Sequence, residues 1–141
     1  VPTKEGTTEQ LVRTLLAVHE SDQSMTFAGD MPEGVSARMM RANFERLVDG
    51  ADGAARHGIT GASGSIHPQC ALLVSCVGRK LVLAERVEDE VEATASVVGS
   101  GVPLMGFYSY GELCPTTDAA NAHGVCQLHN QTMTITTFEE A

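Results

Sequence analysis

The chain has 141 residues, of which 43% are apolar, 19% charged and 4% aromatic, a composition typical of one ordinary globular domain. Eighteen acidic against nine basic side chains give a net charge of −9. This charge repels phosphate groups and excludes DNA, RNA and anionic membrane surfaces as partners. No apolar stretch approaches the roughly 20 residues of a membrane span, and no secretion signal opens the sequence.

We therefore expect a cytoplasmic protein. Residues 14–141 are predicted to fold as a single domain, and the polar residues 1–13 are interpreted as the remnant of a linker in a longer polypeptide. At this length a domain buries about 70% of the surface of its unfolded chain, so it needs no disulfide or structural metal.

The four cysteines lie at positions 70, 76, 114 and 126, a spacing that matches neither a zinc knuckle nor a disulfide framework. Cys70 and Cys76 border an apolar run, where a reduced thiol acts as a small apolar side chain. We expect reduced, mostly structural cysteines. A redox or soft-metal site that joins Cys114, Cys126 and a histidine is the alternative.

The first predicted elements are strands. Residues 14–19 form a short, nearly continuous apolar run, which favours a buried strand. Apolar and polar residues alternate over residues 25–28 and again over 35–40, with a glycine- and proline-containing turn at 29–34 between them. The pattern predicts a hairpin with one buried side.

Two helices are predicted from apolar residues at helical spacing. The first runs from an N-cap at Asn43 to a stop at Gly58. Its apolar face consists of Phe44, Leu47, Val48, Ala51, Ala54 and Ala55. The second helix carries its apolar stripe on Val87, Val91, Ala95 and Val98. Its acidic residues, Glu88, Asp89, Glu90 and Glu92, are expected to form a solvated outer face.

The most apolar run of the chain spans residues 70–77 and predicts a central strand that is covered on both faces. Residues 104–110 are also strand-like. In residues 125–138 the apolar positions change from even to odd numbers, so a bulge or strand break is expected at 129–132. The whole pattern favours an α+β fold: a mostly antiparallel sheet of about six strands with two main helices packed on one face.

Polar residues gather where the predicted strands end, and these are the candidate site residues. They are Ser75, Cys76 and Arg79; Tyr108, Tyr110 and Glu112; and His129 and Asn130. Tyr108, Tyr110 and Glu112 share one face if their strand stays extended through Glu112. Convergence of these clusters on one cavity predicts a ligand pocket.

The chemistry of this cluster has more than one interpretation. Arg79 offers a planar fork for a carboxylate, the tyrosines offer apolar faces with hydroxyl tips, and Glu112 offers a partner for an ammonium. Together they would recognise a zwitterion. Alternatively Arg79 pairs with Glu112 inside the domain and the tyrosines are packing residues, or the cluster forms an interface.

His129 and Cys76 leave further alternatives open. His129 beside the predicted bulge is a ligand contact, a metal or haem ligand, or a side chain that ties down irregular backbone, and Asn130 is expected to be structural. Cys76, with His129 and Glu112 nearby and Arg79 to stabilise a thiolate, would constitute a nucleophilic enzyme site.

Three blocks of sequence carry a resemblance to a known family. They are LLVSCVGRK (residues 72–80), PLMGFYSYGELCP (103–115) and LHNQTMTIT (128–136). With these blocks the chain resembles the C-terminal half of the FIST family of intracellular signal-transduction sensor proteins.

The resemblance implies a non-catalytic input module that has neither a catalytic motif nor a resident cofactor. Such a module binds a small ligand, which is often proposed to be amino-acid-like. Some relatives are linked to haem and gas sensing, which makes a haem-binding gas sensor the runner-up. The implied partners are the N-terminal FIST half of the full-length protein and a signalling partner such as a kinase or cyclase. A homodimer is a further expectation.

Overall fold

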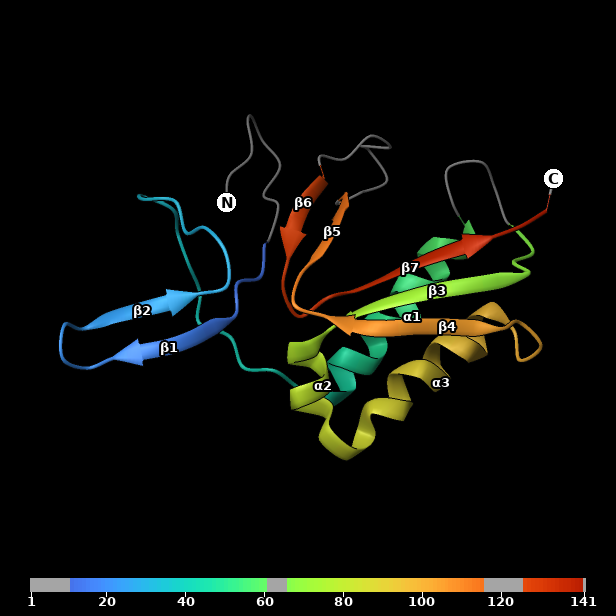
Figure 1. Cartoon of the computed structure of the whole chain (residues 1–141), viewed down its shortest axis with the longest axis horizontal. Coiled ribbons are helices and arrows are strands. Elements are labelled where there is room, and N and C mark those ends of the chain that lie inside the picture. The colour runs from blue at the N-terminus through green and yellow to red at the C-terminus, as the bar shows by residue number, and fades with distance from the viewer. Residues whose placement is uncertain (1–10, 61–65, 116–125, 141) are drawn as a thin grey trace.

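The computed structural model describes residues 11–60, 66–115 and 126–140, and its elements confirm the α+β class. In chain order they are β1 (Leu15–His19), β2 (Ser24–Phe27), α1 (Phe44–Thr60), β3 (Cys70–Cys76), α2 (Val77–Leu83), a 3-10 turn (Ala84–Arg86), α3 (Val87–Val98), β4 (Leu104–Ser109), β5 (Glu112–Pro115), β6 (Cys126–His129) and β7 (Met133–Phe138) (Figure 1). None of the helices in these ranges has the length and apolar character needed to cross a bilayer.

The described strands form three small sheets. The central one has the order β4-β3-β7, and β1-β2 and β5-β6 are separate hairpins. Pairing is antiparallel in each case except β3-β4, which is parallel because α2 and α3 carry the chain back between these two strands. Antiparallel pairing therefore predominates, as expected, although the strands do not join into one sheet.

Helices α1 and α3 cover one face of the central sheet (Figure 1). The core between them is built from small and branched side chains: Ala55 of α1, Ala71 and Leu73 of β3, and Val98 of α3. On the other face of β3, Leu72 and Val74 are half-buried, and the neighbouring Met105 and Phe107 of β4 are each 60% exposed. The prediction that this strand is covered on both faces is thus wrong for the described part of the chain.

The N-terminal hairpin differs from the prediction. Strand β1 pairs with β2 through a turn at residues 20–23, whereas residues 28–43 contain no helix or strand. Nor is β1 buried, because Leu16 and Val18 are largely exposed. The hairpin projects from the rest of the molecule (Figure 1). A run of six residues was too short to distinguish a core strand from a surface ribbon.

The first helix begins as predicted. The Asn43 side-chain oxygen accepts a hydrogen bond from the Arg46 backbone N–H at 3.3 Å, which confirms the N-cap. The helix passes Gly58 and ends at Thr60. Around Gly58 the helix packs against β7, where an added Cβ would make ordinary van der Waals contacts with Ile135 and Thr137 at 3.6–3.8 Å.

The region after β3 contains a helix that the sequence did not predict. Strand β3 leads directly into α2, so residues 77–83 are helical instead of closing the strand. Helix α3 then follows as expected and ends before Gly99, whose φ of 116° suits a glycine.

The predicted strand break is confirmed. Strand β6 ends at His129 and β7 begins at Met133. Between them Gln131 adopts a φ of 58°, an uncommon conformation for a residue other than glycine. We call residues 130–132 the β6–β7 link.

Gly106 in the middle of β4 provides a test of the packing between β3 and β4. A methyl group at Gly106 would collide with the backbone carbonyl of Leu73. We expect Gly106→Ala to lower the free energy of unfolding by about 1–3 kcal/mol in chemical denaturation.

Gly53 is the matched control, because it lies in α1 and a methyl group there meets nothing within 4 Å. Gly53→Ala should raise the free energy of unfolding by about 0.5–1 kcal/mol. Equal effects of the two substitutions would contradict the close approach at Gly106.

Candidate functional site

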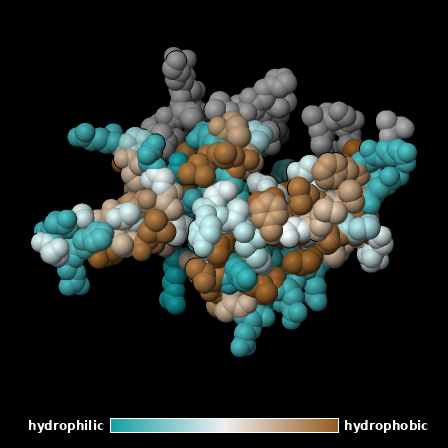
Figure 2. Space-filling model, viewed as in Figure 1, coloured by the Kyte–Doolittle hydropathy of each residue, from teal (hydrophilic) through white to brown (hydrophobic). Residues whose placement is uncertain are grey.

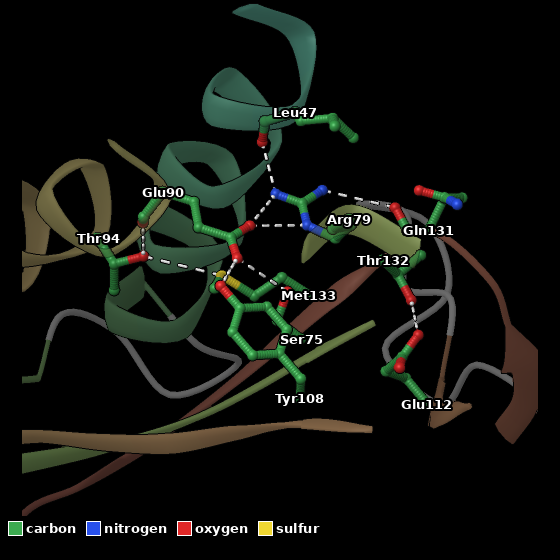
Figure 3. A network of polar contacts seen from close by, with 10 residues as sticks. All are labelled: Leu47, Ser75, Arg79, Glu90, Thr94, Tyr108, Glu112, Gln131, Thr132 and Met133. Carbon is green, nitrogen blue, oxygen red and sulfur yellow. Dashed lines mark hydrogen bonds and ion pairs between the residues drawn. The ribbon is translucent and has the colours of Figure 1, made fainter. Parts of the chain in front are cut away.

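A fully buried carboxylate lies at the centre of the polar residues. Glu90 of α3 is 0% exposed, and its Oε2 accepts a hydrogen bond from Arg79 Nε at 2.9 Å and forms an ion pair with Arg79 Nη2 at 2.8 Å (Figure 3). Its Oε1 accepts hydrogen bonds from the hydroxyls of Ser75, at 3.1 Å, and Tyr108, at 2.8 Å. Three hydrogen bonds, one from each of three neighbouring side chains, and the ion pair with Arg79 thus satisfy both oxygens of this carboxylate, which is what burial of a charge requires.

The local fold explains why these groups meet. Ser75 and Tyr108 are register partners on the parallel strands β3 and β4, and both point toward the helices. Helix α2 starts directly after β3 and places Arg79 beside α3.

The prediction that the acidic residues of α3 form a solvated outer face is wrong for Glu90, which is fully buried. The buried residues of α3 are Glu90, Thr94 and Val98, which repeat every four residues, whereas Glu88 and Glu92 are exposed. Val98 belongs to both the predicted and the observed buried stripe, but Glu90 and Thr94 are buried where Val91 and Ala95 were expected. A carboxylate in the register of Thr94 and Val98 was the available signal, and its place in the acidic stretch from Glu88 to Glu92 obscured it.

Arg79 connects four elements. Besides Glu90, it donates from Nη2 to the backbone oxygen of Leu47 in α1 at 2.6 Å, and from Nη1 to that of Gln131 in the β6–β7 link at 3.5 Å. The side chain is 4% exposed. The alternative in which Arg79 pairs with Glu112 is wrong, since the acidic partner of Arg79 is Glu90. All three guanidinium nitrogens are also already bonded within the domain.

Glu112 forms a second, separate cluster. It is 2% exposed at the start of β5, where its Oε1 accepts a hydrogen bond from the Ser109 hydroxyl at 2.6 Å and its Oε2 one from the Thr132 hydroxyl at 2.9 Å. Thr132 follows Gln131 in the chain, so the two clusters border the same β6–β7 link (Figure 3). Glu112 is thus committed to contacts inside the domain.

The two tyrosines are not brought together. Strand β4 ends at Ser109 and β5 begins at Glu112, so the strand does not stay extended across this region. Tyr110 lies between them and is 91% exposed. Of the two tyrosines, Tyr108 alone contacts the Glu90 cluster.

His129 and Asn130 are buried at the end of β6. His129 Nε2 lies 3.1 Å from the backbone oxygen of Cys114, and Asn130 accepts a hydrogen bond from the Thr14 backbone N–H at 3.0 Å. Asn130 also donates to the backbone oxygen of His129. These contacts hold the β6–β7 link and the base of the N-terminal hairpin in place.

The cysteines are reduced, and Cys76 is buried. Burial raises the pKa of the Cys114 thiol, and the nearby Cys126 and Glu112 raise it further. A raised pKa disfavours the thiolate that redox or metal chemistry needs. Within the described ranges, no group of three or more His, Cys, Asp or Glu side chains has the arrangement of a metal site.

A cavity of about 190 Å³ adjoins the Glu90 cluster. It lies between helix α3 and strands β3 and β4, and residues from both faces of β4 line it. Its walls are Leu73, Val91, Leu104, Met105, Gly106, Phe107 and Met133, and its polar lining is Ser75, Glu90 and Tyr108. The sequence located Ser75 and Tyr108 but missed Glu90 and the apolar walls, which carry no chemical signature in a strand.

Tyr108 is the aromatic group of this cavity. Burial, the hydrogen bond to Glu90 and the charge of Glu90 raise its pKa to about 12, against a smaller opposing effect of Arg79. Lys80 Nζ lies 5.2 Å from the centre of its ring, within cation–π range. The phenol is therefore a neutral donor to Glu90 at neutral pH, and its oxygen can still accept a hydrogen bond.

The buried ion pair yields a stability prediction. Glu90→Ala should lower the free energy of unfolding by about 3–5 kcal/mol, because it leaves the Arg79 guanidinium buried without its counter-charge. The exposed Glu88 on the same helix is the control, and Glu88→Ala should change stability by about 0.5 kcal/mol or less. Similar losses in the two variants, measured by denaturant unfolding, would refute the role given to Glu90.

Tyr108 yields a pH prediction. In Tyr110→Phe, Tyr108 is the sole tyrosine, and its phenolate absorbance should rise with a midpoint near pH 12 while circular dichroism still reports a folded chain. Because the pKa of Tyr108 is higher in the folded chain than in the unfolded chain, the phenol of the unfolded chain loses its proton at lower pH. The contribution of Tyr108 to the free energy of unfolding is therefore complete below pH 10 and is lost as the pH rises from about 10 to about 12. A folded-state midpoint near pH 10 would contradict the burial and the bond to Glu90.

Comparison with known proteins identifies the family. The family model described as the FIST C domain matches residues 2–115, which includes the first two of the three sequence blocks. Neither the search of curated proteins nor that of solved structures found a match. Because the family model covers well over half of the 141 residues, the chain belongs to the FIST C family, a family of sensory, non-catalytic domains implicated in signal transduction.

Proposed function

We propose that this domain is a cytoplasmic sensor module that binds a small molecule in the cavity beside Glu90 and transmits its occupancy to a signalling partner. The observation that carries the proposal is the cavity itself, which combines apolar walls with one polar end made by Tyr108, Glu90 and Ser75. Apolar concave sites with a few convergent polar groups are the usual form of small-molecule sites. The sensory character of the family supports the same role.

The cavity favours a compact ligand. Its volume of about 190 Å³ is small beside the roughly 300–1,000 Å³ of most ligand pockets. Cavities of about 150 Å³ hold a benzene-sized molecule. We infer a ligand of one or two rings, or an equivalent branched aliphatic group, that inserts its apolar part between β4 and α3.

The polar end favours a neutral hydrogen-bond donor on this ligand. Arg79 already balances the charge of Glu90, and both Glu90 oxygens are engaged. The acceptor that remains is the Tyr108 oxygen. An amino-acid-like ligand, which the sequence resemblance implies, could donate from its ammonium group, but its carboxylate would not find a free guanidinium at Arg79.

The structure gives no support to the enzyme alternative. Cys76 is 5% exposed, and His129 is occupied by the backbone oxygen of Cys114. The same contact and the burial of His129 weigh against its use as a haem ligand. We propose instead a non-catalytic module whose partners are the N-terminal FIST half of the full-length protein and a kinase or cyclase that reads its state.

A thermal-shift screen tests the proposal. The screen pairs apolar amino acids with uncharged analogues of the same side chain, such as indole, phenol, benzyl alcohol and isobutanol. A ligand at 100 times its dissociation constant should stabilise the folded chain by about 2.7 kcal/mol. We expect the uncharged members to stabilise at least as well as the amino acids.

Two tyrosine variants identify the site of any hit. Tyr108→Phe keeps the ring but removes the hydroxyl at the polar end of the cavity, so it should weaken the shift. Tyr110→Phe removes a hydroxyl from a side chain that is 91% exposed and should leave the shift unchanged. If a compound produces the same thermal shift in Tyr108→Phe and in the cavity-filling Val91→Phe as in the unaltered chain, the ligand binds elsewhere and the proposed site is wrong.

A further inference from the structure

One edge of the central sheet is free within the described part of the chain. Strand β4 pairs with β3 on one side, and no described strand pairs with its other side. The strand reads LMGFYS, with no charged residue and no proline. Free, uncharged edge strands are templates for another strand, and proteins ordinarily protect them.

The cavity opens along this same edge. Five consecutive residues of β4, from Leu104 to Tyr108, line it, although successive side chains of a strand point to opposite faces. The cavity therefore extends around the edge, between β4 and Val91 of α3. We call it the β4 groove. Gly106 lies in the middle of this groove.

A second segment has the alternating sequence of a strand but pairs with no strand among the described residues. Residues 35–42 read VSARMMRA, with apolar and polar side chains alternating from Val35 to Met39, and these residues belong to no sheet of the described chain. Met39 is 70% exposed and Met40 is 75% exposed. Arg38 and Arg41, which flank them, form no ion pair within the described ranges. This segment is basic and apolar in a chain of net charge −9.

We propose that residues 35–42 of a second copy of this chain add to the free edge of β4 and place a methionine in the β4 groove. The charges are complementary, because the α3 side of the groove carries the exposed Glu88 and Glu92 beside Val91. The two acidic copies would thus meet through the basic segment of one and the acidic helix of the other.

Residues 35–42 can pair with β4 in either of two registers and keep the same kinds of contact. Residues two apart in a strand point to the same face. If Met39 enters the groove, Arg41 also faces α3, and if Met40 enters it, Arg38 does. The other methionine then lies on the open sheet face beside Met105 and Phe107, which are each 60% exposed. Figure 2 shows hydrophobic surface over the central sheet. A flexible methionine fits an irregular apolar cavity well.

Strand addition from a second copy goes beyond small-molecule binding and does not rest on it. Both occupants would use the same groove, so a small ligand should compete with dimerisation where both occur. This competition would provide a direct route from ligand occupancy to assembly. A chain that dimerises without any ligand hit, or binds a ligand without dimerising, would separate the two proposals.

Sedimentation equilibrium of the 141-residue chain tests the proposal. We expect a reversible dimer. The double variant Met39→Asp/Met40→Asp should raise its dissociation constant about tenfold or more, because it places charges in the groove and on the apolar sheet face. Leu81→Asp is the matched control, since Leu81 is 76% exposed on α2 and does not line the groove. It should leave the dissociation constant unchanged.

A charge exchange tests which surfaces meet. Arg38→Glu/Arg41→Glu should weaken the dimer, and adding Glu88→Lys/Glu92→Lys in the same chain should restore it. Restoration requires that the two sets of charges face each other, which a merely structural effect would not produce.

Three results would overturn the proposal. The first is a chain that stays monomeric at the highest soluble concentration. The second is a dimer that responds equally to Met39→Asp/Met40→Asp and Leu81→Asp, which would point to another surface such as the open sheet face. The third is a cross-link between residues 39 and 107 formed within a single monomeric chain, which would mean that the segment docks on its own β4.

Discussion

The buried ion pair between Arg79 and Glu90 is the constraint on which the arrangement of this domain depends. Arg79 also bonds to the backbone of α1 and of the β6–β7 link, while Glu90 accepts hydroxyl groups from both parallel strands. The pair therefore holds helices and sheet in one relative position. A buried pair contributes little net stability compared with apolar residues, but removing one member is costly. Its role here is to fix geometry.

Much of the fold was predictable from local patterns. The period of 3.6 located α1 and α3, Asn43 marked the start of α1, and the change of parity located the break between β6 and β7. The errors arose where tertiary contacts decide. Whether β3 is covered on both faces, and whether residues 35–40 find a partner strand, depends on surfaces that no local pattern encodes.

The candidate site was predictable in its residue types but not in its pairing. Arg79 and Tyr108 do share a cluster, as their positions at strand ends indicated. Their common partner is Glu90, which the sequence hides among the exposed acids of α3. A shift of one position on a helix turns a solvated carboxylate into a buried one, and periodicity does not locate a helix face that finely. The proposed binding of a small molecule rests on family membership and on the cavity.

The projecting β1–β2 hairpin has a consequence for the energetics of the chain. Its base is held by Arg13, which donates to the Leu128 carbonyl, and by the bond from Thr14 to Asn130. Two-stranded ribbons are marginally stable by themselves. We therefore expect this ribbon to open locally without unfolding of the rest of the domain. Its backbone amides should exchange with deuterated solvent long before those of β3.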